Sequence, residues 1–162
     1  MKIALFTTGG TIDKIYFDAL SEFIIGEPQA EQLLLQAGVD VEFTQTVLLR
    51  KDSLELTDQD RMLIAQYVSD VAEEHIIVTH GTDTMVETGR ALKRISNKTI
   101  VLVGAMQPAA MRESDAAFNL GFAVAAVQLA STGVYIAMNG QLFDVDEVRK
   151  DRDAMRFVAT GA

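Results

Sequence analysis

The stretch HIIVTHGTDTMVETGRALKRISNKTIVLV, His75–Val103, contains two short apolar runs separated by a segment of helix length. The runs HIIVT and TIVLV are almost continuously apolar and rich in Ile and Val, which is typical of parallel strands covered on both faces. Between them a helix should begin at Asp83 or Thr84 and end near Arg94, where cations favour a helix end. The stretch therefore predicts a strand–helix–strand unit.

The rest of the chain repeats this alternation of strands and helices. Strands are expected at Ile3–Thr8, Val41–Leu48, His75–Thr79, Thr99–Val103 and Val134–Met138. Further helices are expected from Glu27-Pro28 to about Ala37, from Thr57 to about Glu74 and from Glu113 to Ala130. Asn139-Gly140, between VYIAM and QLFD, predicts a hairpin turn. We therefore expect an α/β domain with a mostly parallel sheet, helices on both faces and a C-terminal hairpin, in flavodoxin-like or Rossmann-like layers.

Length and composition exclude several classes of protein. A chain of 162 residues with 49% hydrophobic residues predicts a single domain, 1–162, with a core of ordinary size. Asp and Glu outnumber Lys and Arg by 23 to 14, so we expect neither nucleic acid nor an anionic membrane as partner. The chain has no cysteine and only two histidines, His75 and His80, which lack HExxH spacing, so no metal or cofactor is expected. No signal-peptide core or spanning segment is evident, which favours a cytoplasmic protein.

Polar segments follow the carboxyl ends of four predicted strands, where parallel sheets bind their ligands. They are TTGGTIDK, RKDSLELT, THGTDT and GAMQPAAMRESD. The first could cradle a phosphate, mount a nucleophilic threonine or form only a tight turn. It lacks both the P-loop and the dinucleotide spacing, so the phosphate interpretation is the weakest of the three.

Hydroxyl chemistry is compatible with these segments. Thr11 follows Gly9 and Gly10, whose missing side chains allow close approach of a substrate and whose N–H groups could stabilise an oxyanion. A hydroxyl nucleophile needs a base and an orienting group. Tyr16 lies a short distance further along the chain, and Lys150 is a second group that could activate a hydroxyl.

Each of these residues also has a structural interpretation that is favoured when it is considered alone. Thr82 or Asp83 before a helix is usually an N-cap, Ser53 is a common turn residue, and Lys150 within EVRKDRD is usually a solvated charge. Their joint occurrence at equivalent strand ends favours a functional site.

The motifs TTGGTI, DSLELT, THGTDTMVET and VGAMQP, followed by SDAAFN, occur in one order between Lys2 and Arg156. In this order they closely resemble the amino-terminal domain of bacterial-type L-asparaginases and glutaminase-asparaginases. The resemblance implies hydrolysis of L-asparagine to L-aspartate and ammonia without a cofactor. In that reaction a threonine hydroxyl attacks the side-chain amide, ammonia leaves, and water then cleaves the acyl-enzyme.

The resemblance also assigns roles to individual residues. Thr11 would be the nucleophile, activated by Tyr16, while Thr82 and Lys150 would assist and the backbone N–H groups of Gly10 and Thr82 would form an oxyanion hole. Substrate binding would fall to Asp52 and Ser53 at the α-carboxylate, Asp83 at the α-ammonium group and Ala105 at the amide nitrogen.

Two departures from the family pattern alter these expectations. Tyr16 comes sooner after the threonine than is usual, and Asp13 and Lys14 replace small residues. The usual carboxyl-terminal domain is also expected to be absent, which predicts a millimolar KM and a homodimer or homotetramer.

Three other interpretations remain open. The chain could be a non-catalytic amino-acid-binding module, an asparaginase-like subunit of a larger amidotransferase, or a fragment of a longer protein. The choice between asparagine and glutamine also stays open, because a single methylene changes substrate discrimination by only ~1–3 kcal/mol.

Overall fold

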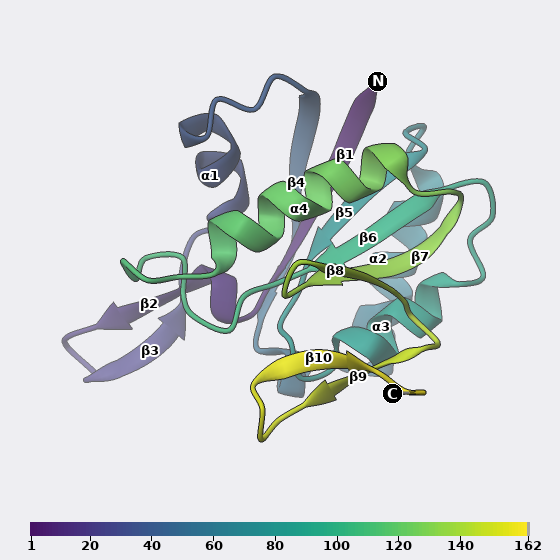
Figure 1. The fold of residues 1–162 in the computed structure, drawn as a ribbon. Helices are drawn as coiled ribbons and strands as arrows, with labels where there is room; N and C mark the ends of the chain where they lie inside the picture. The colour runs from purple at the N-terminus through teal and green to yellow at the C-terminus, as the bar shows by residue number, and fades with distance from the viewer. Residues whose placement is uncertain (162) are drawn as a thin grey trace.

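The computed structural model describes residues 1–161 and has an α/β fold built on one six-stranded sheet (Figure 1). The strands lie in the order β4-β1-β5-β6-β7-β8. Their bounds are Glu42–Lys51, Lys2–Gly9, His75–Thr79, Thr99–Val103, Gly133–Met138 and Gln141–Asp144, respectively. All neighbours pair in parallel except β7 and β8, which are antiparallel. The predicted fold class is therefore confirmed.

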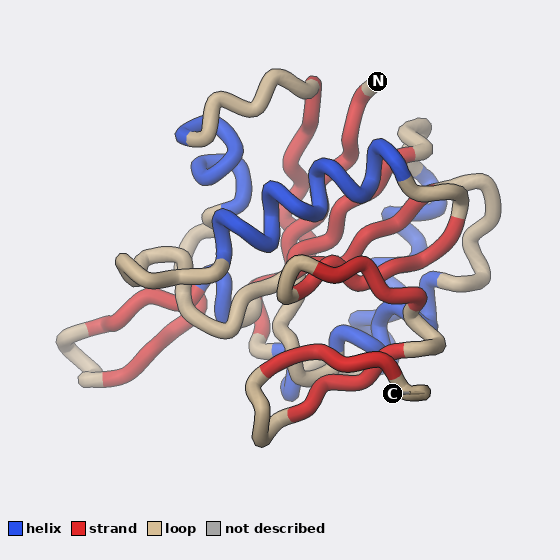
Figure 2. The backbone as a smooth tube through the Cα atoms, viewed as in Figure 1, coloured by secondary structure: helices blue, strands red, loops and turns tan. Residues whose placement is uncertain are grey.

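Helices cover both faces of this sheet, as Figure 2 shows. Helices α1 (Ala30–Gln36) and α4 (Ala116–Leu129) pack on one face, and α2 (Asp58–Asp70) and α3 (Met85–Leu92) pack on the other. Alternate residues of the central strands enter the two cores, which explains why HIIVT and TIVLV are apolar at nearly every position.

A capping box marks the start of α2. The Asp60 N–H donates to Thr57 Oγ1 at 3.2 Å and the Thr57 N–H donates to Asp60 Oδ2 at 2.8 Å, which confirms the expected start of α2. Helix α2 ends at Asp70, earlier than expected, and α4 begins at Ala116 rather than Glu113. The residue before α4 is Asp115, whose carboxylate turns back to the loop after β6.

The predicted hairpin between β7 and β8 is confirmed. Asn139 and Gly140 have φ values of 56° and 71°, both in the left-handed region that a type I′ turn requires. This turn reverses the chain so that β8 forms the antiparallel edge of the sheet.

Two further antiparallel hairpins were not predicted. The hairpin of β2 (Lys14–Phe17) and β3 (Glu22–Ile25) extends away from the body of the domain (Figure 1). The hairpin of β9 (Val148–Asp151) and β10 (Arg156–Ala159) lies near α3, with Phe157 buried in the core. None of the helices within the described residues is long and apolar enough to cross a membrane.

Candidate active site

The loops that follow β1, β4 and β5 meet in backbone contact at one edge of the sheet. A Cβ atom on Gly10 would lie 2.4 Å from the Gly81 Cα, and one on Gly81 would lie 2.6 Å from the Ser53 Cβ. Gly10 also has a φ of 86°, a conformation that L side chains rarely adopt. The glycines therefore allow the close approach of these loops, so that Thr11 and Thr82 lie on touching segments.

Thr82, Asp83 and Lys150 form one hydrogen-bonded group at this edge. Lys150 Nζ donates to Thr82 Oγ1 at 2.7 Å and to Asp83 Oδ1 at 2.9 Å. Thr82 is only 5% exposed, and 12% of the Lys150 side chain is exposed, so water competes weakly for this contact. Lys150 comes from β9, so the hairpin that was not predicted brings a predicted residue into place.

Arg152 also contacts Asp83, with Nε 3.3 Å from Oδ1. Partial burial acts to raise the pKa of Asp83, but the Lys150 and Arg152 cations outweigh it and hold that pKa below its usual range. Asp83 is therefore a carboxylate at neutral pH.

Ser53 connects the loop after β4 to the same group. It is 2% exposed, and its hydroxyl oxygen accepts a hydrogen bond from the Asp83 N–H at 3.3 Å. Its carbonyl oxygen accepts from Thr84 Oγ1 at 2.7 Å. The structure therefore brings together Ser53, Thr82, Asp83 and Lys150, four of the residues singled out from the sequence.

Asp52 lies beside this group and pairs with the hairpin. Lys14 Nζ lies 2.7 Å from Asp52 Oδ2. Partial burial acts to raise the pKa of Asp52, but its contacts with Lys14 and the Leu54 N–H hold it below its usual range. The ion pair joins the start of β2 to the loop that carries Ser53.

Ala105 packs beside the loop that carries Thr11. Ile12, Ala105 and Ala116 form a small buried cluster, and the Ala109 N–H donates to the Ile12 carbonyl oxygen at 3.1 Å. The loop after β6 is therefore fixed against the residue that follows Thr11. Thr11 itself is half-buried at the start of a short 3-10 helix, Thr11–Asp13.

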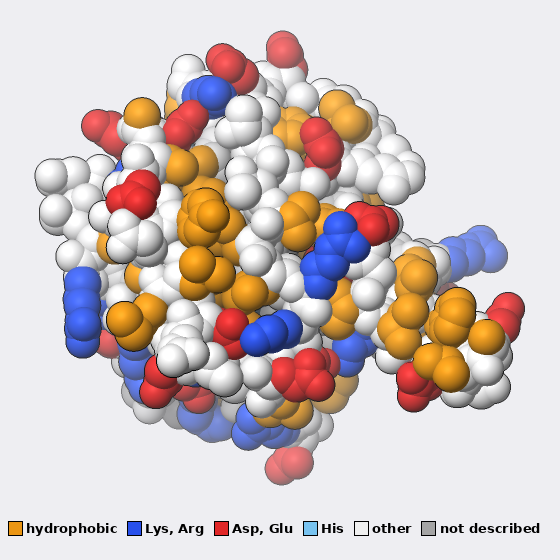
Figure 3. Space-filling view, turned by 180° about the vertical axis from the view of Figure 1, so that it is seen from behind, with side chains coloured by type: hydrophobic (Ala, Val, Ile, Leu, Met, Phe, Trp, Pro, Cys, Tyr) orange, Lys and Arg blue, Asp and Glu red, His pale blue; other side chains and the backbone are white. Residues whose placement is uncertain are grey.

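Tyr16 does not join these residues. It lies on β2 with 55% of its surface exposed, and its ring packs edge-on against Phe23 with the ring centroids 5.5 Å apart. Hydrophobic side chains gather on this protruding hairpin, at the right of Figure 3. The exposed members of the cluster are Tyr16, Phe17, Leu20 and Phe23.

His80 is buried and stabilises the loop that carries Thr82, whereas the sequence indicates only an improbable metal ligand at this position. Its Nδ1–H donates to the Gly81 carbonyl oxygen at 2.7 Å, so Nε2 is free to accept from the Thr88 hydroxyl, also at 2.7 Å. Burial lowers the pKa of His80 to about 4, although the Gly81 carbonyl acts to raise it. A neutral imidazole therefore holds the backbone that leads into Thr82.

Two asparagines link the loop after β6 to the strand opposite Lys150. Asn119 Nδ2 donates to the Gly104 carbonyl oxygen at 3.1 Å, and Asn119 Oδ1 accepts from the Asn139 N–H at 3.3 Å. Asn139 Oδ1 then accepts from the Phe157 N–H at 2.9 Å, and Phe157 pairs with Lys150 in the hairpin. The sequence marked Asn139 only as a turn residue.

Asp13 is buried at the base of the β2–β3 hairpin. Its Oδ1 accepts from the Gln29 N–H at 2.9 Å and its carbonyl oxygen accepts from the Gly26 N–H at 2.8 Å, while Oδ2 has no partner within the described residues. Burial raises the pKa of Asp13 to about 6, against the Gln29 N–H and the charge of Arg50, which lower it.

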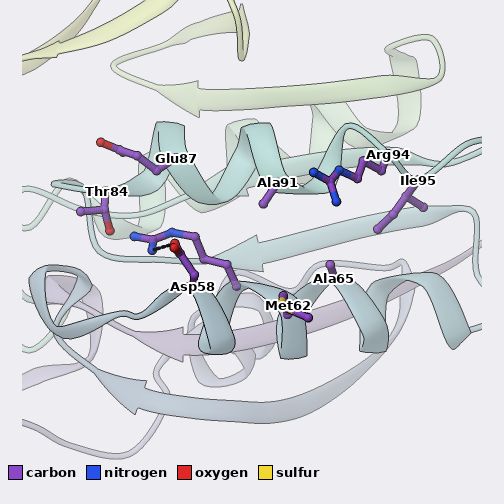
Figure 4. A pocket seen from close by; sticks show the side chains of 9 residues that line it. Asp58, Met62, Ala65, Thr84, Glu87, Ala91, Arg94 and Ile95 are labelled. Atoms are coloured by element: carbon purple, nitrogen blue, oxygen red, sulfur yellow. Dashed lines mark hydrogen bonds and ion pairs between the residues drawn. The ribbon is translucent and has the colours of Figure 1, made fainter.

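A separate groove of about 510 Å³ lies between α2 and α3 (Figure 4). Its floor is apolar, formed by Met62, Ala65, Ala91 and Ile95, with Arg94 at one end and Thr84 and Glu87 at the other. The Thr84 hydroxyl, the one hydroxyl among the lining residues that the structure describes, donates to the Ser53 carbonyl oxygen, so the sheet edge is the better candidate for chemistry. No group of three or more His, Asp or Glu side chains within the described chain is placed to hold a metal ion.

Comparisons with known proteins confirm the resemblance seen in the motifs. The family described as Asparaginase, N-terminal, matches residues 2–158. A glutaminase-asparaginase from Acinetobacter glutaminasificans is 30% identical over 172 residues, covering 91% of this chain and 49% of that protein. A probable cytoplasmic L-asparaginase from Campylobacter jejuni has a similar structure, with a TM-score of 0.83 and 27% identity over 98% of this chain and 52% of that one.

A third relative is a component of the glutamyl-tRNA(Gln) amidotransferase from Methanococcus vannielii. It is 44% identical over 73 residues, which cover 44% of this chain and 17% of that protein. The chain spans about half the length of the glutaminase-asparaginase and the L-asparaginase it matches.

Proposed function

The chain belongs to the asparaginase family, and from this premise we propose that it is an amidohydrolase that converts L-asparagine to L-aspartate and ammonia through an acyl-enzyme on Thr11. The observation that carries the proposal is the contact of 2.7 Å between Lys150 Nζ and Thr82 Oγ1, on a loop in backbone contact with that of Thr11. A lysine that is shielded from water and bonded to a hydroxyl is the kind of pair that moves protons in hydrolysis.

In the first step, the Thr11 oxygen attacks the side-chain amide carbon of the substrate. We propose that the β2–β3 hairpin closes over Thr11 and that the Tyr16 hydroxyl then relays the Thr11 proton to the amide nitrogen, which leaves as ammonia. The backbone N–H groups of Gly10 and Thr82 would stabilise the negative oxygen of the tetrahedral intermediate.

In the second step, water attacks the ester carbon of the acyl-enzyme. We propose that the Thr82 hydroxyl, held by the Lys150 ammonium group, relays the proton of this water to the departing Thr11 oxygen, so that the ester bond breaks, L-aspartate is released and the Thr11 hydroxyl is restored. Both steps balance without a cofactor.

Substrate recognition would use the charged groups around Ser53. Asp83, a carboxylate, would bind the α-ammonium group, and the Ser53 hydroxyl, beside Asp52, would bind the α-carboxylate. The carbonyl oxygen of Ala105 would accept from the amide nitrogen. The site would then bind the α-ammonium and α-carboxylate groups of the amino acid as well as its side-chain amide.

We also propose that residues 1–162 act as one catalytic domain, in the cytoplasm, and as a homodimer or homotetramer. The exposed apolar side chains of the β2–β3 hairpin support self-association, because burying them removes apolar surface from water. Light scattering at micromolar concentration tests this, and a monomer mass would contradict it.

The test of the function is ammonia release from L-asparagine, L-glutamine and D-asparagine by the wild type and by Thr11→Ala. We expect release from L-asparagine that falls by at least a thousandfold in Thr11→Ala, since general acid–base and nucleophilic groups each contribute ~10²–10⁴. A folded Thr11→Ala protein with wild-type activity would remove Thr11 from the mechanism.

A second candidate function is that of an ammonia-releasing component of an amidotransferase. The 44% identity over 73 residues to the amidotransferase component from Methanococcus vannielii favours it. Ammonia release that requires an added partner protein and its tRNA would support this function, and release by the isolated chain would favour a free asparaginase.

A further inference from the structure

Arg152 sits where a substrate with an α-ammonium group should bind. Its Nε lies 3.3 Å from Asp83 Oδ1, the same oxygen that accepts from Lys150 Nζ at 2.9 Å. One carboxylate thus serves two cations, and only Oδ2 remains for a ligand. An ammonium group that reaches Asp83 therefore approaches two positive charges as well as one negative charge.

Lys150 and Arg152 together carry more positive charge than Asp83 alone neutralises. Among the described residues, the other carboxylate that lines the hollow beside Asp83 is that of the exposed Glu87. Arg90 Nε lies 3.9 Å from Asp146, which it shares with Lys93. Arg149 pairs with Asp151 at 3.7 Å. On the other side of Ser53, Lys14 neutralises Asp52, so neither carboxylate flanking the site is without a cation.

A hollow of about 250 Å³ adjoins Asp83 and leaves room for a group to reach Arg152. Its charged lining consists of Asp83, Glu87, Arg90, Arg149, Lys150 and Arg152. The Arg152 side chain is 66% exposed, so its guanidinium can turn toward a ligand while its stem stays in place. A guanidinium binds carboxylates well because its N–H groups match the two carboxylate oxygens.

We propose that Arg152 is a specificity-determining residue that lets the site accept monoamides of dicarboxylic acids without an α-ammonium group, such as succinamate, which is asparagine without that group. The inference rests on the proposed amidohydrolase function. Arg152 attracts the carboxylate that both amides carry and repels the ammonium group that only asparagine carries. Because Arg152 is exposed, water and salt screen it, and the change in selectivity should be about fivefold.

The experiment compares kcat/KM for succinamate and for L-asparagine in the wild type, Arg152→Gln and Arg152→Lys. Arg94→Gln is the matched control, because Arg94 lines the groove between α2 and α3, away from Asp83. We expect the succinamate-to-asparagine ratio to fall about fivefold in Arg152→Gln, less in Arg152→Lys and not at all in Arg94→Gln. The fall should shrink at high salt, which a purely structural role would not produce.

A ratio that is unchanged in Arg152→Gln, or that falls equally in Arg94→Gln, would overturn the inference. If the wild type releases ammonia from neither amide, the proposed function fails, and calorimetry with succinamate then tests Arg152 by itself. Binding about fivefold weaker in Arg152→Gln would support the inference. Equal binding, or none to the wild type, would refute it.

Discussion

Two regions of the proposed site differ in burial. The edge of the sheet around Thr82 is buried, whereas the β2–β3 hairpin that carries Tyr16 is mostly exposed. Thr82, Ser53 and His80 are at most 5% exposed, and the side chains of Ser53 and His80 both bond to the backbone of the loop that carries Thr82. Tyr16 is 55% exposed on a two-stranded hairpin that extends from the domain. The two regions meet at the short segment from Thr11 to Asp13.

This contrast separates two tasks of the proposed site. The sheet edge holds Thr82 and Lys150 in one fixed geometry, which hydrolysis of the acyl-enzyme ester requires. The hairpin is anchored at its base, through Asp13 and the Lys14–Asp52 pair, and its tip is exposed to solvent. Substitutions at the edge should therefore affect chemistry most, and those in the hairpin less.

The largest effect should come from the sheet edge. Lys150→Met keeps the stem of the side chain but removes the ammonium group bonded to Thr82 Oγ1. We expect kcat/KM for L-asparagine to fall about a thousandfold in Lys150→Met and in Thr82→Ala, with little further loss in the double variant, since the two act as a unit. Arg149→Met, on the same strand, is the control and should lose less than about threefold. More than a tenth of wild-type activity in Lys150→Met would contradict this role.

A smaller effect is expected where the two regions join. Asp13 has its pKa raised from 3.8 to about 6, so its stabilising contribution is full below pH of about 4 and is lost as pH rises through about 6. Asp13→Asn keeps an acceptor for the Gln29 N–H but cannot ionise. At pH 8 it should therefore be more stable than the wild type by about 3 kcal/mol, and the difference should vanish below about pH 4.

Urea unfolding of both proteins at several pH values measures this difference. A gap that stays constant from pH 4 to pH 8 would show that ionisation of Asp13 is not its cause.

The hairpin itself should give the smallest of these effects. Tyr16→Phe removes only the hydroxyl of an exposed side chain, so the free energy of unfolding should change by less than about 0.5 kcal/mol. Because the proposed mechanism brings the Tyr16 hydroxyl to Thr11, kcat should nevertheless fall about a hundredfold. Tyr67→Phe, an exposed tyrosine on α2, is the matched control. Activity of Tyr16→Phe within twofold of the wild type would exclude Tyr16 as the activating group.

The same contrast explains what the sequence could predict. Local sequence signals are sufficient for the apolar runs that form β1, β5 and β6 and for the capping sequence at Thr57. The end of each predicted strand also places its loop at the observed edge of the sheet. The contacts of Ser53, Thr82, Asp83 and Lys150 agree with their shared assignment to one site.

The two missed hairpins lack a local signal. The turn of β2–β3 places Ser21 at a φ of 52°, and that of β9–β10 places Met155 at 52°, both without the glycine or asparagine that marks such turns. His80 holds the loop before Thr82 through its buried hydrogen bond with Thr88, which is eight residues further along the chain. The hydrogen bonds that connect Asn119 with the hairpin of Lys150 join α4, the turn after β7 and β10. Those contacts exist only once the fold has formed.

The central claim is that the Thr11 oxygen carries the acyl group, and rapid quenching of the wild type with L-asparagine followed by peptide mass spectrometry tests it most directly. We predict an added aspartyl group on the tryptic peptide Ile3–Lys14, located at Thr11 by fragmentation and absent in Thr11→Ala. An aspartyl group on the peptide Met62–Arg90, at Thr82, would contradict the claim and make the buried sheet edge the site of attack.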